Sequence, residues 1–386
     1  MPEHMNSIAL MLESDAPGGA EVFLLHQAEE LRSRGYRVIP VLPSWKTGWL
    51  SDRFRERGFV PTTFTLQRAM DWDCLRALAA DLDSLGVDII HSHEFAMAVY
   101  GAVVSRVLSK RHVITMHGNQ WIMEARRRRF ALRWAFAASH AVVAVSEDTR
   151  KHLTESMGLK EGAIVTVPNG VPEPDGSPEG PRSEFGLRPD EVVFIAVGNL
   201  SERKGHIVLL RALQRVRDDG CAVPWRLIIA GEGPERARLE TFVSEAGLGG
   251  LVHLPGHRAD VDDLQAAAHV MVMPSLWEGL PLAVLEGMFA GNAVVASSAS
   301  GIPEAVRDGQ DGFLVPAGDH EVLAGVLRRL LEQPELRAGL GASARDRARS
   351  RFSVQRMMDE YELLYAPAVP KAARPRAGGA TARANR

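Results

Sequence analysis

Short runs of β-branched and other apolar residues alternate with helical patterns along almost the whole chain. Parallel strands cannot be joined by a tight turn, and each needs a crossover that is usually a helix. Strands covered by helices on both faces form continuous apolar runs, as in VVFIAV at 192–197. The alternation therefore predicts an α/β fold with doubly wound parallel sheets. The expected strands are 7–12, 37–43, 88–93, 111–117, 141–146, 163–170, 192–199, 225–233, 251–256, 269–275, 293–298 and 312–318.

The chain is too long for one hydrophobic core. Its 386 residues exceed the roughly 250–300 at which single cores stop growing, so two domains are expected. The stretch VPEPDGSPEGPRSEFG (171–186) is rich in Pro and Gly and has no periodicity, which is typical of a linker. Two facing doubly wound domains would bind ligands beyond the carboxyl ends of their strands. The expected order is an N-terminal domain (1–171), a linker (172–186), a C-terminal domain (187–352), a last helix (353–366) and a basic tail of disordered composition (367–386). Whether the last helix returns to the N-terminal domain is left open.

Composition indicates an intracellular globular protein. Hydrophobic residues make up 46% and charged residues 24%, which is ordinary for a globular chain. No apolar run approaches the roughly 18–20 residues of a membrane span, and the start MPEHMNSIALMLES lacks a secretory pattern. The two cysteines, Cys74 and Cys221, lie far apart in sequence, so no disulfide framework is implied. We therefore expect a cytoplasmic location.

The stretch PSLWEGLPLAVLEGMFAG (274–291) contains two acids, Glu278 and Glu286, and no other charge. Apolar residues at three- and four-residue spacing predict a helix that begins at Pro281 and ends at Gly291. No Ser, Thr, Asp or Asn precedes this start, so its N–H groups and the helix dipole favour an anion such as phosphate. The alternative is a buried helix whose acids reach solvent or a neighbouring Arg.

Two other loops that follow strands suit an anion. Gly18 and Gly19 introduce a long amphipathic helix, although a simple tight turn would look the same. Arg203 and Lys204 follow the strand at 192–199, where Arg offers a fork and Lys a point charge for phosphate; a solvated basic pair is the alternative. The segment IIAGEGP (228–234) lacks the third glycine of a dinucleotide fingerprint, so no NAD site is expected.

The sequence contains few signs of a metal site. His91 and His93 lie on one side of a predicted strand, and zinc with His117 is a less favoured alternative because the usual ligand spacings are absent. The Asp-x-Asp patterns at 71–73 and 81–83 fall in a helical segment, where surface acids and an N-cap are expected. His117 ends an apolar strand, where it either donates to a ligand oxygen in a cleft or is a satisfied core residue.

Together these segments resemble family 4 of the glycosyltransferases. The block PSLWEGLPLAVLEGMFAGNAVVASSASGIPEAVRDGQDGFLVPAGD (274–319) is similar to the signature region of that family, including its E-x7-E pair. VGNLSERKG, APGGAE, DIIHSH, TMHG, AVVAVSE and VPNGV are similar to its other landmarks, in the usual order. The resemblance extends from about residue 7 to 365 and implies the GT-B fold and a retaining, metal-independent transfer of a sugar from a nucleotide diphosphate sugar.

The resemblance also implies roles for individual residues. Glu286 would bind the ribose hydroxyls, and Glu278 would hold sugar hydroxyls and face the charge that develops at the anomeric carbon. Arg203 and Lys204 would neutralise the diphosphate, and His117 would touch the transferred sugar or its phosphate from the other domain. The remaining donor-binding positions are Gly18, Gly19, Asn199, His257, Gly279, Leu280, Leu282 and Ala283. Asn292, His269 and Ser300 depart from the family pattern, and Ser300 puts contacts to the donor in doubt.

A basic strip lies in the first half of the chain. QWIMEARRRRFALRWAFAASH (120–140) combines Trp121 and other aromatics with Arg126, Arg127, Arg128 and Arg129. A basic amphipathic helix with aromatics is typical of a surface for anionic lipid, here the inner face of the cytoplasmic membrane. An ordinary amphipathic helix with Trp134 in the core is the alternative, and nucleic acid is a weaker one because the rest of the chain is neutral to acidic.

The sequence thus predicts a glycosyltransferase that uses a UDP- or GDP-linked sugar and a glycan, lipid-linked or small-molecule acceptor. Synthesis of cell-envelope polysaccharide or glycoconjugate is the expected role, with no cofactor, no metal and no nucleic-acid partner. A GT-B-fold sugar-nucleotide epimerase or phosphorylase is one alternative. A non-catalytic subunit that binds a nucleotide sugar is the other.

Overall fold

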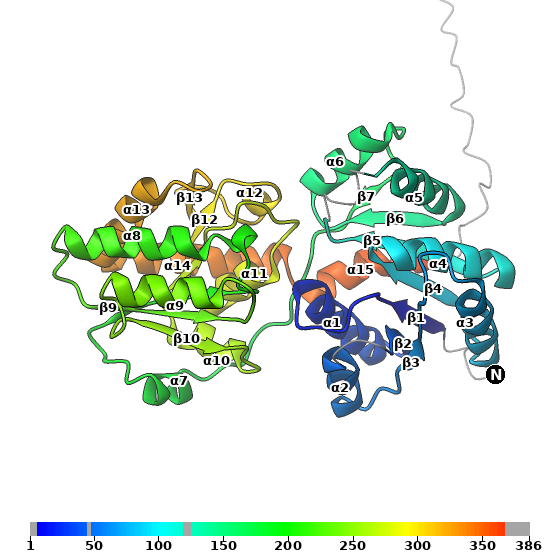
Figure 1. Ribbon diagram of the computed structural model, residues 1–386, viewed down its shortest axis with the longest axis horizontal. Helices are drawn as coiled ribbons and strands as arrows, with labels where there is room; N and C mark the ends of the chain where they lie inside the picture. Colours follow the sequence, from blue (N-terminus) through cyan, green and yellow to red (C-terminus); the bar gives the residue numbers. More distant parts are fainter. Residues whose placement is uncertain (1–5, 45–47, 119–124, 367–386) are drawn as a thin grey trace, which may run out of the picture.

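The computed structural model describes residues 6–44, 48–118 and 125–366, and consists of two α/β domains side by side (Figure 1). The N-terminal domain is built on a parallel sheet with strand order β3-β2-β1-β4-β5-β6-β7. Its strands are β1 (Ser7–Met11), β2 (Arg37–Pro43), β3 (Thr62–Phe64), β4 (Ile89–His93), β5 (Arg111–Met116), β6 (Ala141–Ala144) and β7 (Val165–Thr166). Its helices are α1 (Gly19–Ser33), α2 (Trp49–Glu56), α3 (Trp72–Ser84), α4 (Glu94–Leu108), α5 (Arg126–Ala138) and α6 (Glu147–Met157).

The C-terminal domain repeats this plan with strand order β10-β9-β8-β11-β12-β13, again parallel throughout. Its strands are β8 (Val192–Val197), β9 (Trp225–Ala230), β10 (Val252–Gly256), β11 (Val270–Met273), β12 (Ala293–Ser297) and β13 (Gly312–Val315). The remaining helices are α7 (Glu179–Glu184), α8 (His206–Asp218), α9 (Arg236–Glu245), α10 (Val261–Ala267), α11 (Leu282–Ala290), α12 (Ile302–Ala305), α13 (His320–Glu332), α14 (Pro334–Arg351) and α15 (Val354–Tyr365). The α/β class and the two doubly wound sheets that the alternation predicts are therefore confirmed.

Each expected strand is present in the structure, and one strand was missed. Strand β3 at the edge of the first sheet has only three residues, TTF, which is too short for a periodic signal. The segment expected as a linker contains α7, whose six residues include Pro181 and Gly180. The basic tail over 367–386 lies outside the described residues.

Both sheets reverse their strand order at one point, between β1 and β4 in the first domain and between β8 and β11 in the second. The loops that leave these four strands diverge to opposite faces of each sheet, which opens a crevice at the carboxyl ends of the strands. The segments flagged as anion sites, after β1, after β8 and after β11, all begin at these crevices. The topology alone therefore gathers them toward the space between the domains.

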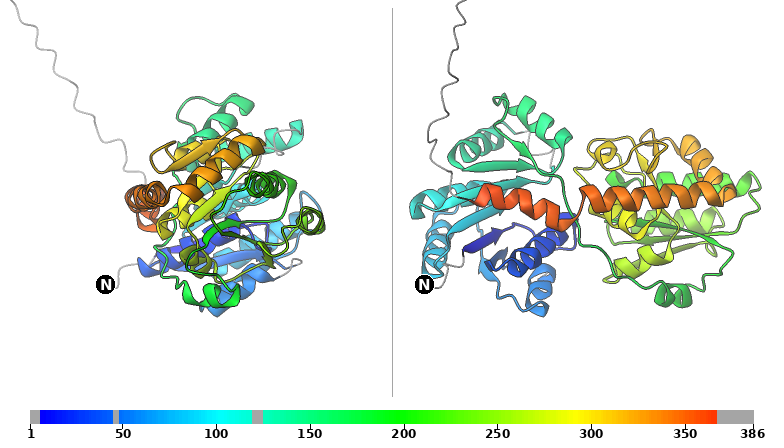
Figure 2. Two further views of the ribbon diagram at one scale, coloured as in Figure 1. Left: turned by 90° about the vertical axis from the view of Figure 1, so that its left-hand side faces the viewer. Right: turned by 180° about the vertical axis from the view of Figure 1, so that it is seen from behind.

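The chain crosses between the domains twice, and the two crossings are hydrogen-bonded to each other. Val171 donates its N–H to Phe352 O at 2.9 Å, and Val354 donates to Val171 O at 2.9 Å. Helix α14 belongs to the second domain, whereas α15 continues onto the first, and the two run along the back of both domains (Figure 2). The C-terminal helix thus returns to the N-terminal domain.

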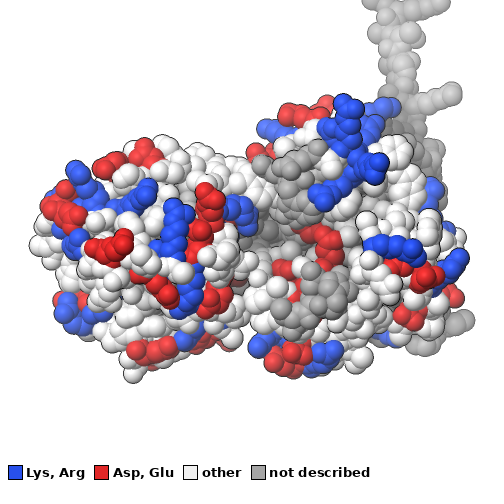
Figure 3. All heavy atoms as spheres, viewed as in Figure 1, with Lys and Arg blue, Asp and Glu red and all other residues white. Residues whose placement is uncertain are grey.

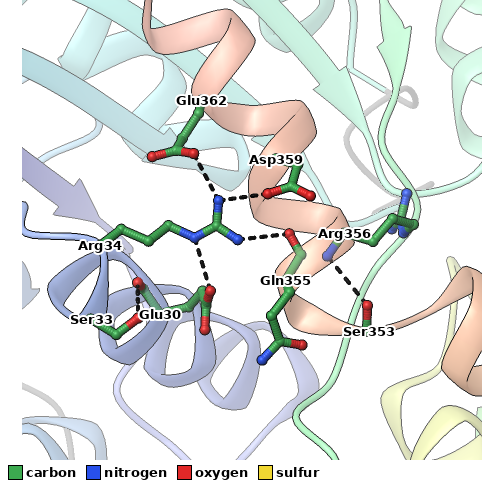
Figure 4. A network of polar contacts seen from close by, with 8 residues as sticks. All are labelled: Glu30, Ser33, Arg34, Ser353, Gln355, Arg356, Asp359 and Glu362. Atoms are coloured by element: carbon green, nitrogen blue, oxygen red, sulfur yellow. Dashed lines mark hydrogen bonds and ion pairs between the residues drawn. The ribbon is translucent and has the colours of Figure 1, made fainter.

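Arg34, at the end of α1, fixes α15 to the N-terminal domain (Figure 4). Its guanidinium donates to Asp359 at 2.8 Å, to Glu362 at 2.7 Å and to the carbonyl of Gln355 at 2.9 Å. Several charge-assisted bonds to one guanidinium form a network with more restricted geometry than a single surface pair. Helix α1 begins at the cleft between the domains, and Arg34 is its C-cap. This network therefore links α15 to the C-terminal end of α1, away from the cleft.

No helix among residues 6–44, 48–118 and 125–366 combines the length and the apolar character needed to cross a lipid bilayer.

Candidate active site

A cavity of about 660 Å³ lies between the carboxyl edges of the two sheets and is lined by both domains. Figure 3 shows the hollow between the two domains. Acidic side chains are visible there on the side of the N-terminal domain. The structure brings all of the predicted donor-site residues to this cavity. They are Gly18, Gly19, His117, Asn199, Arg203, Lys204, His257, Glu278, Gly279, Leu280, Leu282, Ala283 and Glu286.

Helix α11 opens onto the cavity with an uncapped N-terminus. Pro281, expected as the first helical residue, is instead the N-cap, with extended backbone (φ −72°, ψ 121°) and no side-chain capping hydrogen bond. The expected end at Gly291 is confirmed, because this residue adopts the left-handed conformation (φ 83°) that terminates helices. The amides near Leu282 and Ala283 therefore face the cavity without a side-chain cap from the helix itself.

Helix α1 has the same property in the opposite domain. Its N-cap is Gly18, in extended conformation, and no side chain caps it. The residues of its first turn line the same cavity as the start of α11. Two uncapped helix N-termini, one from each domain, thus contribute partial positive charge to one space.

Glu278 lies just ahead of α11 and pairs directly with the two cations. Lys204 Nζ is 2.7 Å from Glu278 Oε1, and Arg203 NH1 is 3.4 Å from Oε2. The carboxylate is only 6% exposed. Burial alone would raise its pKa, but the charges of Lys204 and Arg203 outweigh burial and hold the pKa of Glu278 below its usual range. The carboxylate is therefore ionised at neutral pH.

Glu286 lies inside α11 and has the opposite electrostatic setting. It is partly exposed to the cavity, and burial together with the nearby Asp262 raises its pKa to about 7. The two acids of the E-x7-E pair thus differ in charge near neutral pH. This difference arises because Glu278 has two cationic neighbours, whereas Glu286 has an acidic one.

The N-terminal half of the cavity contains a neutral histidine, His117, at the end of β5. Its ring Nε2 is 3.0 Å from Nδ1 of His93, a fully buried residue on β4. Burial lowers the pKa of His117 to about 3, so the ring is uncharged at neutral pH. One ring nitrogen of His117 is bonded to a buried residue, and the residue also lines the cavity, so donation to a ligand oxygen stays a prediction.

His91 and His93 point to the same side of β4, as the period of a strand requires, and their rings stack at 4.4 Å. His91 is bonded to Thr115 and to Tyr365 of α15, at 2.8 and 2.6 Å. Its ring nitrogens are therefore occupied by protein groups. Over the ranges that the structure describes, no group of three or more His, Cys, Asp or Glu side chains has the arrangement of a metal site. Asp71 of the first Asp-x-Asp pattern caps α3, as expected.

The domains touch beside the cavity through glycines. A Cβ on Gly279 would clash with the carbonyl oxygen of His117, and one on Gly301 would clash with the carbonyl oxygen of Gly279. Ser300, where the family usually has glycine, adopts the left-handed region with φ 48°. Close approach of the two domains therefore requires glycine at position 279, whereas Gly301 allows close packing within the C-terminal domain, and Ser300 is held in a strained conformation.

Sequence reasoning missed three acids. Glu21, in the first turn of α1, and Glu94, which follows β4 with φ 64°, both line the cavity. Glu304 of α12 accepts hydrogen bonds from the backbone N–H groups of Glu147 and Asp148, at 2.8 Å each, and so caps helix α6 of the other domain. Glu21 stands in the quoted APGGAE motif and Glu304 in the quoted signature block. No local signal connects Glu304 to a helix that is more than 150 residues earlier.

The basic helix α5 lies outside the cavity. Its residues Arg126, Arg127 and Arg128 are exposed, and so are Phe130 (75%) and Trp134 (41%). The alternative that places Trp134 in the core is therefore wrong, because Leu132, Ala135 and Phe136 form the buried face instead. Trp121 lies outside the described residues.

Known proteins share these sequence and structural features. A family model described as "Glycosyltransferase Family 4" matches residues 17–173, and one described as "Glycosyl transferases group 1" matches residues 181–347. A UDP-Gal:alpha-D-GlcNAc-diphosphoundecaprenol alpha-1,3-galactosyltransferase of Escherichia coli is 25% identical over 334 residues, which cover 83% of this chain and 85% of that protein. Alpha-maltose-1-phosphate synthase of Mycolicibacterium smegmatis is 28% identical over 327 residues, which cover 75% and 83%.

Among solved structures, HepE of Anabaena in complex with UDP and glucose superposes with a TM-score of 0.79 at 25% identity. The superposition covers 94% of this chain and 99% of that one. The two family models together extend over both domains. The galactosyltransferase of Escherichia coli matches this chain over most of its own length. The chain is therefore a glycosyltransferase of family 4 with the GT-B fold.

Proposed function

We propose that this glycosyltransferase takes its sugar from a nucleotide diphosphate sugar and transfers it, with retention of anomeric configuration, to a hydroxyl of an acceptor. One observation carries the proposal. Lys204, Arg203 and two uncapped helix N-termini converge on a single cavity that also contains Glu278 and Glu286. Positive groups of this kind bind a diphosphate, and carboxylates beside them accept hydrogen bonds from sugar hydroxyls.

The departing diphosphate accumulates negative charge as the glycosidic bond breaks. Lys204, Arg203 and the amides near Leu282 already line the cavity, so after donor binding they are in place to stabilise this charge. These cations supply the charge that a divalent metal would otherwise provide, and we propose that the reaction needs no metal. The Anabaena relative with UDP and glucose supports UDP as the first nucleotide to test.

Glu278 has two successive partners in this proposal. Without donor its carboxylate pairs with Lys204 and Arg203. When the diphosphate binds, the cations turn toward phosphate oxygens and the ionised carboxylate accepts hydrogen bonds from the sugar. It then faces the oxocarbenium-like charge at the anomeric carbon, which a carboxylate stabilises.

A thermal-shift screen of the full chain against UDP, GDP and ADP tests the donor site. A ligand that binds only the folded state stabilises it by about 2.7 kcal/mol at one hundred times its Kd. We expect one nucleoside diphosphate to raise the melting temperature, and release of that nucleotide from the matching sugar nucleotide when an acceptor is added. Failure of all three nucleotides at millimolar concentration would contradict the proposal.

We further propose that the acceptor is presented at an anionic membrane. The Escherichia coli relative is named for an acceptor linked to diphosphoundecaprenol, a lipid carrier. Helix α5 exposes Arg126, Arg127 and Arg128 beside Phe130 and Trp134, which combines charge for lipid headgroups with aromatics for the interface. Such a surface fits a peripheral enzyme of envelope polysaccharide synthesis.

Sedimentation with liposomes tests this surface. Replacing Arg126–Arg129 by Ser should release the protein from vesicles that contain anionic lipid, because each basic residue near such a surface contributes about 1 kcal/mol. A matched variant with Arg211, Arg215, Arg238 and Arg349 changed to Ser removes four exposed charges from the other domain and should bind normally. Equal binding by both variants would exclude α5.

A further inference from the structure

His93 and His117 form a pair of imidazole rings that lie edge to edge. The N···N distance between His93 Nδ1 and His117 Nε2 is 3.0 Å, the ring centroids are 5.3 Å apart, and the planes differ by only 20°. With the bonded nitrogens between the two centroids, an N–H of one ring points at the in-plane lone pair of the other. This is a hydrogen bond in a favourable geometry, and not a face-to-face stack.

Each ring of the pair carries a single proton. Burial holds the pKa of both histidines far below neutrality, and for His93 the neighbouring His91 and His117 rings add to this effect. A neutral imidazole has one N–H donor and one lone pair. The N···N bond therefore has two possible directions, and its direction decides which nitrogen of His117 is protonated.

The surroundings of His93 favour one direction. Its second nitrogen, Nε2, is fully buried and has no hydrogen-bond partner. If His117 donated to His93, the His93 proton would lie on this Nε2, as a buried N–H without an acceptor. Buried orphan N–H groups are rare because they lose their hydrogen bonds to water. If His93 donates instead, Nε2 keeps only a lone pair, which is the less costly arrangement.

We propose that His93 is a positioning residue that donates from Nδ1 to His117 Nε2 and thereby makes Nδ1 of His117 an N–H donor toward the cleft. Nδ1 of His117 has no protein partner among the described residues and does not belong to the buried unpaired atoms, so it is left for the cavity that His117 lines. Oxygens of a diphosphate can only accept, and an N–H donor matches them. The choice of this ligand rests on the proposed function, whereas the tautomer itself does not.

The rest of the site holds the ring in this orientation. Glu94 accepts the backbone N–H of His117 at 3.2 Å, and the ring of Phe23 packs edge-on against it at 4.7 Å. His91 covers the face of His93 at 4.4 Å and keeps water from that side. His117 is thus fixed through its backbone, its ring face and one ring nitrogen, which leaves the tautomer as its remaining freedom.

Long-range ¹⁵N–¹H correlation spectra of the full chain, labelled with ¹⁵N only in histidine, read the tautomer directly. The His117 signals are assigned from their loss in His117→Gln. At pH 7 without ligand we expect a protonated Nδ1 and a bare Nε2. A proton on Nε2, or on both nitrogens, would overturn the proposal. No substrate is needed, so failure of the proposed function would leave this result unaffected.

A pair of variants tests whether His93 imposes the tautomer. His93→Phe keeps a ring between His91 and His117 but removes the donor, so Nε2 of His117 loses the hydrogen bond to its lone pair. We expect the ¹⁵N signal of this nitrogen to shift toward that of an unbonded lone pair and kcat to fall about three- to ten-fold, with a smaller change in the KM for the donor. His112→Phe is the control, since His112 is equally buried but bonds to Ser92 and Ser139. Unchanged His117 signals in His93→Phe, or equal changes in both variants, would contradict the role of His93.

Discussion

The two halves of the cleft use different physical means to address one ligand. The C-terminal half is charged, since Lys204 and Arg203 pair with the buried carboxylate of Glu278 at the start of an uncapped helix. The N-terminal half also contains the acids Glu21 and Glu94, but its predicted ligand contact is His117, which is neutral and hydrogen-bonded to a second neutral ring. In the proposed reaction this difference separates two tasks: the charges stabilise a leaving diphosphate, whereas a neutral donor at a strand end sets orientation without competing for that charge.

Among the changes considered, replacing a single charge in the C-terminal half should therefore have the largest effect on turnover. Glu278→Gln keeps the shape of the side chain but removes the carboxylate that we propose faces positive charge at the anomeric carbon. We expect kcat to fall by about 10²–10³-fold, the usual cost of removing one electrostatic group from a transition state. Steady-state kinetics with a saturating nucleotide sugar measures this effect.

Glu202→Gln is the matched control, because Glu202 is exposed and adjacent in sequence to Arg203. The control should retain wild-type turnover and the same melting temperature. If Glu278→Gln turned over at the wild-type rate, the carboxylate would have only a structural role, and the two halves would not differ in the way described.

Much of this arrangement is predictable from sequence, and the limits have a physical cause. The run VVFIAV predicts β8, and the absence of a capping residue before Leu282 predicts the uncapped helix, because both depend on neighbours along the chain. The ion pair between Lys204 and Glu278 joins the loops after two different strands. It follows from topology only once both strands are placed at one switch point.

Contacts between side chains from segments far apart in the sequence are harder to predict. Glu304 caps a helix whose first residue is Glu147, and His93 meets His117 across two strands. No periodicity or residue spacing in the sequence indicates either contact, because each depends on how segments far apart in the chain pack together. The charge state of Glu286 could not be predicted from sequence either, because its pKa is raised to about 7 by burial in the fold and by Asp262, which belongs to a different helix.

The second expected effect is a dependence of donor affinity on pH. Burial and Asp262 raise the pKa of Glu286 to about 7, so this acid is neutral below that pH and ionised above it. A carboxylate forms stronger hydrogen bonds to ribose hydroxyls than a protonated acid does. We expect the affinity for a nucleotide sugar, measured by calorimetry, to rise about ten-fold from pH 6 to pH 8.

The stability of the unliganded protein should change in the opposite sense. An unfolded glutamate ionises near pH 4.5, whereas folded Glu286 keeps its proton until about pH 7. Between these values the unfolded state has lost the proton and the folded state retains it, so the contribution of this group to stability falls as pH rises.

Three controls define this prediction. The ligand must be a nucleotide sugar, since the terminal phosphate of a free nucleoside diphosphate itself titrates near pH 6, as phosphate monoesters do. Glu286→Gln should remove the change in affinity, and Asp262→Asn should move its midpoint to lower pH because the acidic neighbour is gone. Identical pH profiles for wild type and Glu286→Gln would assign the dependence to another group.

The smallest expected effect concerns the contact that brings the two halves together. Glu304 of the C-terminal domain accepts from Glu147 N and Asp148 N at 2.8 Å, while Ser146 caps the same helix from within its own domain. Glu304→Gln keeps one acceptor but turns an amide N–H₂ toward a helix N-terminus. This change should destabilise the arrangement in which the two domains touch beside the cavity, here called the closed form, by about 1 kcal/mol. Donor affinity should then fall about two- to five-fold, because only the closed form presents both halves to the ligand.

Small-angle scattering of the variant without donor should show a larger mean radius of gyration than that of the wild type. Glu335 is an exposed acid in the first turn of α14, and the control variant Glu335→Gln should change neither the donor affinity nor the radius of gyration. If the close glycine contacts alone stabilised the closed form, Glu304→Gln would have the same donor affinity and radius of gyration as Glu335→Gln. Closure would then not depend on the Glu304 carboxylate at the N-terminus of α6.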